Sequence, residues 1–257
     1  MTRIMTYNVH RCVGTDGRLD VGRVADVIAR QAPDIVALQE VDVGRARTRG
    51  VDQAHELAHR LEMTFHFNAA LVIEEERYGD AVLTRLPERR IKAGGLPGHP
   101  GHRAFRGLEP RGALWLSVDV GGVQVQVLNT HLGLVPAEQA AQATALAGPE
   151  WLGHADCRPP TLLVGDLNAV VGSRALRRLM ARLRDARTLA PAHERLGGGA
   201  FVGLATFPSR MPIVAIDHIL VSAGISVRRM TVPRDRVTAV ASDHAPLVMD
   251  FEVTASG

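Results

Sequence analysis

The stretch Ser242-Asp243-His244-Ala245-Pro246-Leu247 sets a carboxylate and an imidazole against the start of the last apolar run of the chain. Similar polar groups lie at the ends of five earlier apolar runs. They are Asn8, Gln39-Glu40, Asn129-Thr130-His131, Gly165-Asp166-Leu167-Asn168 and Ile216-Asp217-His218. Because strand ends deliver side chains to one edge of a sheet, these groups predict a single site. Carboxylates, amides and imidazoles without cysteine suit a hard divalent cation and proton transfer.

The spacing of apolar residues predicts alternating strands and helices. Strands are expected at 2–9, 34–38, 64–73, 79–85, 112–120, 123–131, 161–165, 216–222, 225–232 and 246–253. Helices are expected at 19–32, 51–62, 136–152 and 173–184, the last capped by Ser173. The two kinds of element alternate irregularly, and Gly121-Gly122 indicates a hairpin. This order predicts an α/β fold of mixed sheets covered by helices, not a doubly wound parallel sheet.

Composition restricts the class of protein. The chain has 257 residues, of which 46% are hydrophobic and 22% charged, as expected for one globular domain over 1–257. Cys12 and Cys157 define neither a disulfide framework nor a zinc site, which favours a reducing compartment. The N-terminus shows no signal-peptide pattern, and no apolar stretch approaches the length of a membrane span. We therefore expect a cytoplasmic monomer.

Basic residues are almost all arginine, because Lys92 is the only lysine among 30 Lys and Arg. Arginine suits phosphate binding, but a genome rich in G and C gives the same bias. Five arginines of the predicted helix 173–184 therefore form either a solvated face or a surface for a nucleic-acid backbone. The Gly- and Pro-rich segment Gly94–Gly112 is either a substrate-facing loop or a plain surface loop.

Seven motifs occur in one order along the chain. They are Thr6-Tyr7-Asn8, Leu38-Gln39-Glu40, Gly79-Asp80-Ala81-Val82-Leu83-Thr84-Arg85, Asn129-Thr130-His131-Leu132, Gly165-Asp166-Leu167-Asn168-Ala169, Ile216-Asp217-His218-Ile219 and Ser242-Asp243-His244-Ala245-Pro246-Leu247. In this order the chain resembles the endonuclease/exonuclease/phosphatase superfamily, which has the fold of deoxyribonuclease I. The resemblance implies a four-layer α/β sandwich with two mixed sheets face to face and helices outside.

The resemblance also implies a metal site and catalytic groups. Glu40, with Asn8 and Asp243, would bind Mg²⁺ or Mn²⁺. His244 would act as general base, oriented by Asp217. The remaining catalytic positions are Asp166 for the attacking water, and Asn168, His131 and Arg111 for the phosphate or the leaving group.

Three further residues lie within these motifs or directly beside one of them. Asp80 stands where many relatives have asparagine, and its carboxylate would add charge to the site. Tyr78 is either a site residue or a surface residue. His218 follows Asp217 directly and is expected to face away from the site, because neighbouring strand residues point to opposite faces.

The resemblance leaves three functions open. The first is a metal-dependent phosphodiesterase or phosphatase acting on a small-molecule or lipid-headgroup ester. The second is a DNA or RNA nuclease, and the third is a catalytically silent binding module. Complete acid, base and ligand positions disfavour the third. A content of 4% aromatic residues offers little for base stacking, which favours the first over the second.

Overall fold

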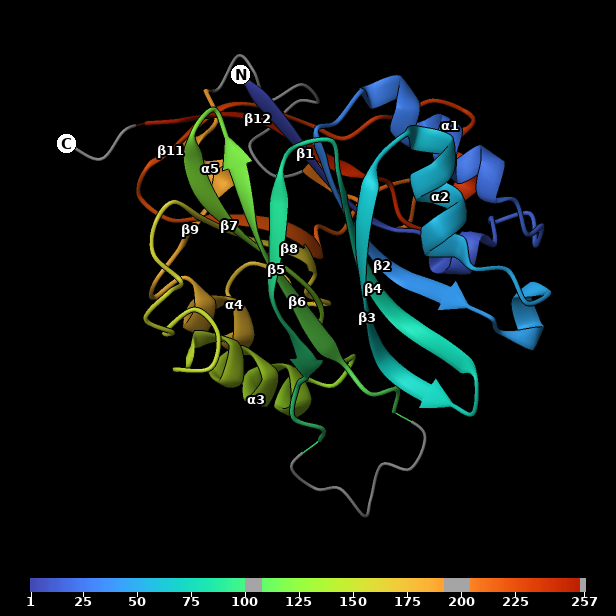
Figure 1. The fold of residues 1–257 in the computed structure, drawn as a ribbon, viewed down its shortest axis with the longest axis horizontal. Coiled ribbons are helices and arrows are strands. Elements are labelled where there is room, and N and C mark those ends of the chain that lie inside the picture. The colour runs from blue at the N-terminus through green and yellow to red at the C-terminus, as the bar shows by residue number, and fades with distance from the viewer. Residues whose placement is uncertain (100–107, 192–203, 255–257) are drawn as a thin grey trace.

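The computed structural model describes residues 1–99, 108–191 and 204–254. Two six-stranded sheets form its centre (Figure 1), and both are mixed. The first has the order β11-β12-β1-β2-β4-β3. Its strands are β1 (Thr2–Asn8), β2 (Ile35–Val43), β3 (Thr64–Ile73), β4 (Glu76–Thr84), β11 (Ile225–Thr231) and β12 (Leu247–Val253). The second has the order β5-β6-β7-β8-β10-β9. Its strands are β5 (Glu88–Gly95), β6 (Gly112–Val120), β7 (Val123–His131), β8 (Thr161–Asp166), β9 (Arg184–Asp185) and β10 (Asp217–Val221).

The two sheets pack face to face because their strands alternate apolar residues toward each other. One cluster joins Ile4 and Val82 of the first sheet to Leu114, Val127 and Val164 of the second. All five side chains are at most 1% exposed. Full burial of such a side chain contributes about 1.5–3 kcal/mol, so this interface contributes substantially to stability.

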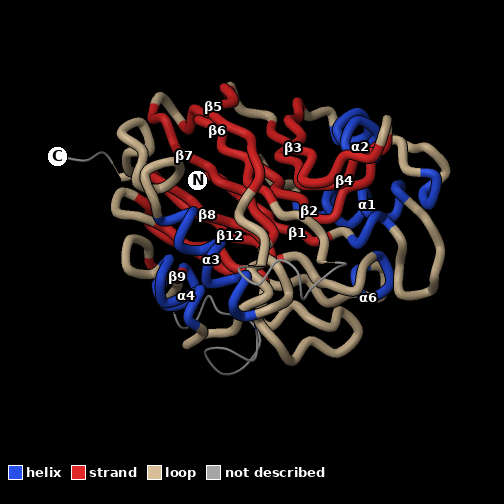
Figure 2. The backbone as a smooth tube through the Cα atoms, turned by 90° about the horizontal axis from the view of Figure 1, so that it is seen from below, coloured by secondary structure: helices blue, strands red, loops and turns tan. Residues whose placement is uncertain are grey.

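Helices cover the two outer faces. On the first sheet lie α1 (Val21–Gln31) and α2 (Gln53–Leu61), and on the second α3 (Pro136–Ala147) and α4 (Arg174–Leu179). Figure 2 shows the two helix pairs on opposite sides of the strands. Short elements complete the chain. They are η1 (His10–Cys12), η2 (Ala46–Thr48), α5 (Ala186–Leu189) and α6 (Thr238–Ala241). The predicted four-layer α/β sandwich is thereby confirmed.

Each sheet contains one parallel pair of strands, and these pairs position the site. β1 runs parallel to β2, and β7 runs parallel to β8. Three of these strands end at Asn8, His131 and Asp166, whereas Gln39-Glu40 lie in the middle of β2, at a bulge beside the end of β1. β10 runs antiparallel to β8 with Asp217 opposite Asp166, so the start of β10 meets the end of β8.

Some predicted elements differ from the structure. The helix expected over 173–184 ends at Leu179, and the next residue, Met180, is 39% exposed. The helix expected to reach residue 152 ends at Ala147. β5 was not expected, and Gly95, its last residue, lies within the predicted loop Gly94–Gly112. Residues 100–107 of that loop lie outside the described residues.

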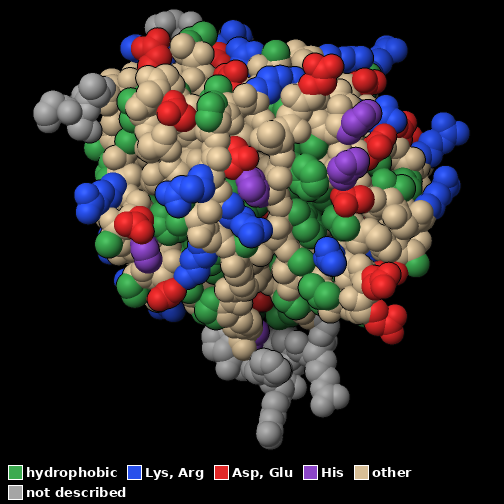
Figure 3. Space-filling model, viewed as in Figure 1, with side chains coloured by type: hydrophobic (Ala, Val, Ile, Leu, Met, Phe, Trp, Pro, Cys, Tyr) green, Lys and Arg blue, Asp and Glu red, His purple; other side chains and the backbone are tan. Residues whose placement is uncertain are grey.

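Charged side chains are distributed over the surface. On the face drawn in Figure 3, basic and acidic side chains are interspersed and no continuous basic patch forms. Among the described residues, no helix has the length and apolar character needed to cross a membrane.

Candidate active site

Buried amides join the two sheets beneath the site. Gln39 Nε2 donates to Oδ1 of Asn129 at 2.8 Å, across the space between β2 and β7. Asn129 Nδ2 in turn donates to the backbone oxygens of Leu38 and Ala81 at 2.9 Å. Both amide side chains are fully buried, so breaking this network would leave unpaired polar groups in the core. The sequence motifs include these two residues, but their bridging role is visible only in the structure.

Asn8 connects the carboxylates of the two sheets. Its Nδ2 donates to Glu40 Oε1 at 3.1 Å and to Asp166 Oδ2 at 3.0 Å. Glu40 lies in a bulge between Leu38 and Val41, where β2 shifts register against β4. Its φ of 58° is a left-handed conformation that a non-glycine residue rarely adopts. The backbone of Glu40 is therefore strained, and this conformation turns its carboxylate toward Asn8.

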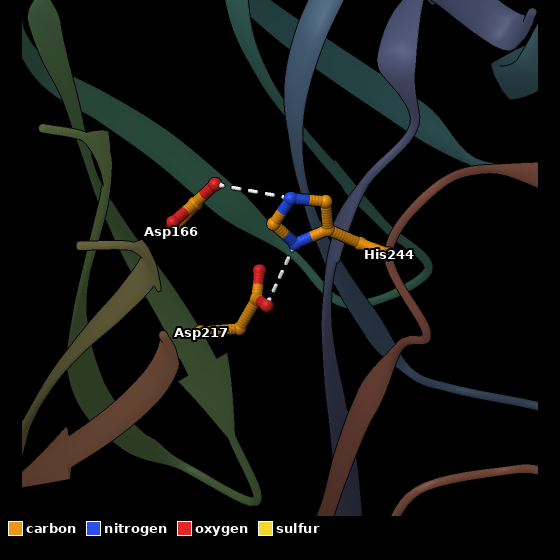
Figure 4. Close-up of side chains that lie close together, drawn as sticks. All are labelled: Asp166, Asp217 and His244. Atoms are coloured by element: carbon orange, nitrogen blue, oxygen red, sulfur yellow. Dashed lines mark hydrogen bonds and ion pairs between the residues drawn. The ribbon is translucent and has the colours of Figure 1, made fainter. Parts of the chain in front are cut away.

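A buried acid–imidazole–acid chain forms the centre of the site (Figure 4). His244 Nδ1 lies 2.9 Å from Asp217 Oδ2, and His244 Nε2 lies 3.6 Å from Asp166 Oδ2. These three residues come from the loop before β12, the start of β10 and the end of β8. The ring of Phe207 packs against the His244 ring, with 5.0 Å between the centroids. All three ionisable side chains are at most 6% exposed.

Burial and the neighbouring carboxylates shift the pKa of His244 in opposite directions. Burial alone would lower the pKa of His244, but the carboxylates of Asp217, Asp166 and Asp243 outweigh it and raise that pKa to about 10. Burial and the neighbouring Asp217 raise the pKa of Asp166 to about 7. The neighbouring carboxylates therefore favour the protonated imidazole of His244, which is held between two carboxyl groups.

His131 is held in one neutral form by its neighbours. Arg111 Nη1 donates to Nδ1 of His131 at 3.1 Å, so the ring proton is on Nε2. That nitrogen lies 3.5 Å from Asp166 Oδ2 and 3.0 Å from Asn168 Nδ2. Burial and the charges of Arg111 and His244 hold the pKa of His131 well below its ordinary value. His131 therefore offers a hydrogen-bond donor without a positive charge.

Asn168 is positioned by its own backbone and by its side chain. Its backbone N–H donates to Asp166 Oδ1 at 2.9 Å, and its Nδ2 donates to the carbonyl of Leu132 at 2.9 Å. A φ of 47° turns the chain sharply after Asp166. These contacts place Asn168, His131 and Asp166 side by side, as the order of motifs predicts.

Asp243 lies nearer the surface than the other acidic residues. Its side chain is 38% exposed, and its Oδ1 lies 3.9 Å from Nδ1 of His10. The preceding Ser242 donates through Oγ to the backbone oxygen of Asn8 at 2.7 Å, which fixes this loop against the end of β1. The structure thus brings Asp243 beside Asn8, while Asn8 contacts Glu40 directly.

The donor atoms fit a hard divalent cation. Glu40 and Asp243 offer carboxylate oxygens, whereas the Asn8 amide oxygen accepts from the backbone N–H of His10 at 3.0 Å and its Nδ2 faces Glu40. Cys12 and Cys157 lie in the helix-packed clusters, so their thiols offer no ligand here. Within the described ranges, one group of acidic and histidine side chains has ligand atoms within 4.8 Å of one another. Its members are Asp166, Asp217 and His244. The Oδ1 atom of Asp217 is buried without a hydrogen-bond partner, so oxygen donors remain available around the site.

Asp80 and Tyr78 both lie buried beside the site on β4. Burial raises the pKa of Asp80 to about 8, although Arg111 partly opposes this. At neutral pH the protonated, uncharged form of Asp80 is therefore favoured. Tyr78 is 2% exposed, with the guanidinium of Arg47 lying 5.2 Å from its ring centroid.

His218 belongs to a separate buried cluster behind Asp217. Its Nδ1 lies 3.0 Å from Nη1 of Arg187, and its Nε2 lies 2.8 Å from the carbonyl of Ala169. The side chain thus faces away from Asp166, as strand alternation predicts. Arg187 was missed in the sequence, where it is one arginine among many. Its only local signal is the Asp185 that precedes it by two residues and caps α5.

Together, the double-sheet sandwich and its buried acid–imidazole site define a phosphoester hydrolase of the deoxyribonuclease I-like class. The chain belongs to the Endonuclease/Exonuclease/phosphatase family, whose sequence model matches residues 5–244. A comparison with curated proteins yields no match.

Solved structures with the same fold cover nearly the whole chain. An endonuclease/exonuclease/phosphatase from Beutenbergia cavernae DSM 12333 is 26% identical, with a TM-score of 0.74 over 98% of this chain and 71% of that one. A mannosyl-6-phosphatase from Bacteroides thetaiotaomicron VPI-5482 is 18% identical, with a TM-score of 0.75 over 98% and 100%. The human Nocturnin catalytic domain with bound sulfate is 19% identical, with a TM-score of 0.69 over 98% and 93%. The last two likenesses concern the fold alone.

Proposed function

We propose that this protein is a divalent-metal-dependent phosphoester hydrolase that attacks the phosphorus atom with water. The observation that carries the proposal is the buried chain of contacts from Asp217 through His244 to Asp166. An isolated imidazolium in the core would be costly, but two carboxyl groups in contact with it stabilise it. Such a fixed cation beside a carboxyl group suits a reaction that develops negative charge on a phosphate.

Glu40, with Asn8 and Asp243, would hold the Mg²⁺ or Mn²⁺ ion, which when bound would neutralise charge on the phosphate and on the leaving oxygen. Asn8 also fixes the positions of the carboxylates around the proposed metal site. It donates to both Glu40 and Asp166, so the metal ligand and the water-binding residue keep a fixed separation.

We propose a different base from His244, the base that the resemblance implies, because the surrounding carboxylates raise the pKa of His244. An imidazolium at neutral pH accepts no proton, so His244 donates through Nε2 toward the phosphate. Asp166 is the proton acceptor for the attacking water, since a base works best when its pKa lies near the working pH. Asp217 holds the His244 ring in place and maintains its charge.

Arg111, His131 and Asn168 complete the phosphate side of the site. Arg111 supplies the positive charge, and it fixes the His131 tautomer that presents an Nε2 proton. Asn168 Nδ2 donates to the carbonyl of Leu132 and lies 3.0 Å from the same ring nitrogen, so its amide is held beside His131. We propose that these donors bind the non-bridging oxygens and assist departure of the leaving group.

The substrate that we favour is a small-molecule or lipid-headgroup phosphoester. Three observations support it: the few aromatic residues, the interspersed charges of Figure 3, and a phosphatase among the proteins of the same fold. A nuclease is the second candidate. It is supported by Arg174, Arg177 and Arg178, which are exposed on and beside α4 and line a hollow of about 530 Å³ together with α3 residues.

A substrate panel tests the proposal. Hydrolysis of bis-(p-nitrophenyl) phosphate, p-nitrophenyl phosphate, a sugar 6-phosphate, a phospholipid, plasmid DNA and abasic duplex DNA would be measured with Mg²⁺ and Mn²⁺. Glu40→Ala serves as the inactive control. We expect turnover of small or lipid esters by the wild type alone. If no substrate is hydrolysed above the Glu40→Ala level, the proposed function is wrong.

Salt dependence separates the two substrate classes within the same panel. A polyanion that contacts several arginines binds much more weakly as salt increases, whereas a single phosphate responds little. Efficient DNA cleavage that falls steeply with salt, and falls further in an Arg174→Gln/Arg177→Gln/Arg178→Gln variant, would establish the nuclease instead.

A further inference from the structure

Arg187 is a fully buried cation directly behind the candidate active site. Its side chain has no exposed surface, although arginine is rarely buried completely. It projects from α5, whose first turn is capped by Asp185: the Asp185 Oδ1 atom accepts from the Arg187 backbone N–H at 2.9 Å. Asp185 Oδ2 lies 3.7 Å from Arg187 Nη1 and balances its charge. The pair therefore places one guanidinium at a fixed position beside the start of β10.

The Arg187 guanidinium binds backbone oxygens beside the first residues of β10. β9 pairs with β10 only at Leu220 and Val221, so within the described residues no strand pairs with the first residues of β10 on that side. There, Arg187 Nη2 donates to the backbone carbonyl of Asp217 and contacts that of Leu204 at 3.4 Å. Asp217 is the residue that holds the His244 ring. Arg187 consequently fixes the backbone from which the Asp217 carboxylate projects.

The same guanidinium is also linked, through His218, to the turn after β8. Arg187 Nη1 donates to Nδ1 of His218 at 3.0 Å, which places the ring proton on Nε2. His218 Nε2 then donates to the carbonyl of Ala169 at 2.8 Å. Ala169 directly follows Asn168 in the turn that begins at Asp166. One side chain thus connects the backbone of Asp217 to the turn that carries Asp166 and Asn168.

We propose that Arg187 is a positioning residue, which sets the distance between Asp217 and the Asp166–Ala169 turn through its contacts with the Asp217 carbonyl and His218. This inference rests on the proposed function, because it assigns Arg187 a part in that reaction. The His244 ring lies between Asp217 and Asp166. The distance that Arg187 sets is therefore the distance across which His244 contacts both carboxylates. A purely stabilising role would not require a buried charge, since apolar residues of similar volume fill cores at least as well.

The chain offers a matched control in Arg3. This residue also pairs with a carboxylate, at 2.6 Å from Asp250, and its Nη1 also donates to a backbone carbonyl, that of Gln31. It lies at the start of β1, whereas the site lies at the end of that strand. Arg3→Gln therefore removes a comparable set of contacts without touching the site.

The test is a double-mutant cycle with Asp217. Arg187→Lys and Arg187→Gln would be measured in the wild type and in Asp217→Asn, at a temperature where circular dichroism shows every variant folded. In the wild type we expect kcat to fall about 10- to 100-fold, the cost of a small displacement of reacting groups, with KM changed less than about threefold. In Asp217→Asn the same substitutions should cost less than about threefold, because the residue positioned has already lost its function. Arg3→Gln should lower Tm without a comparable loss of kcat.

A spectroscopic measurement makes the test independent of turnover. The Nδ1 proton of His244, hydrogen-bonded to Asp217, would be observed by NMR in the metal-free protein and assigned by its loss in Asp217→Asn. We expect Arg187→Lys, which retains the buried charge but loses the guanidinium fork, to shift or broaden this signal, while Arg3→Gln leaves it unchanged. Equal losses of kcat in both backgrounds, or an unchanged signal in folded Arg187→Lys, would overturn the proposal. A wild type inactive on every ester would instead reject the proposed function, and the NMR result would still decide whether Arg187 positions Asp217.

Discussion

Asp166 lies where contacts from both sheets converge. It receives hydrogen bonds from Asn8 and from the backbone of Asn168, and the imidazoles of His131 and His244 lie 3.5 and 3.6 Å away. These contacts orient both of its oxygens. Burial nevertheless raises its pKa, so the residue is held in a fixed geometry while remaining able to gain and lose a proton near neutral pH.

Removing His244 should cost more than removing the charge of its partner. We expect His244→Ala to lower kcat about 1,000-fold or more, since it deletes the buried cation, and Asp217→Asn to lower it about 10- to 100-fold. Steady-state kinetics with a hydrolysed ester from the panel would measure both, with circular dichroism as the control for folding. Near-wild-type activity of His244→Ala would show that the assigned site is wrong.

The activity should depend on pH through these two groups. Asp166 must lose its proton to act as base, so kcat/KM should rise with pH up to about 7. His244 must keep its proton, so kcat/KM should fall above about pH 10. Because Asp217 raises the pKa of His244, Asp217→Asn should move the alkaline limb to lower pH. An alkaline limb that stays in place in Asp217→Asn would contradict this assignment of charge.

At the scale of elements, pattern and capping explain the helices that the sequence predicts well. In α1, Val24 and Ile28 are buried one turn apart, and Asp20 caps the first turn. The helix expected over 173–184 extends too far because Leu183 follows Leu179 at helical spacing. β5 was missed because Glu88, Arg89, Arg90 and Lys92 obscure the alternation that marks a strand. Charged residues are common in such edge strands, where they prevent pairing with other chains.

The cap of α1 should contribute measurably to stability. Asp20 Oδ1 accepts from the backbone N–H of Arg23 at 2.8 Å, so Asp20→Ala should lower the free energy of unfolding by about 1 kcal/mol. Thermal and urea unfolding would measure the change. Asp26→Ala, on the exposed face of the same helix, is the matched control and should cost less. Equal losses in the two variants would show that the cap contributes nothing specific.

At the scale of the whole molecule, the site exists only because two sheets meet. Asn8 and Glu40 come from the first sheet, whereas His131, Asp166 and Asp217 come from the second. Gln39 and Asn129 hold the facing strands together beneath them. The proposed metal ligands and the groups proposed to surround the attacking water are therefore assembled by the same packing that stabilises the core.

Metal binding should consequently affect both activity and stability. We expect EDTA to abolish hydrolysis, and Mg²⁺ or Mn²⁺ to restore it. Because an ion that binds only the folded protein stabilises it, Tm should rise with metal concentration in the wild type but not in Glu40→Ala. Activity measurements and thermal scans across a metal titration would show this. Full activity in excess EDTA would reject the metal-dependent mechanism.

The sequence alone determined the family, the order of the strands that carry the site, and the residue types delivered at their ends. These features are local. Short stretches such as Leu38-Gln39-Glu40 contain both the apolar periodicity and the polar residues that follow it. Burial and charge depend on distant neighbours, and only the tertiary structure decided them. The imidazolium state of His244, the neutral state of Asp80 and the bridge formed by Arg187 all arise where segments far apart in the chain exclude water together. A pKa or a buried ion pair is a property of that shared environment, which no single stretch of sequence contains.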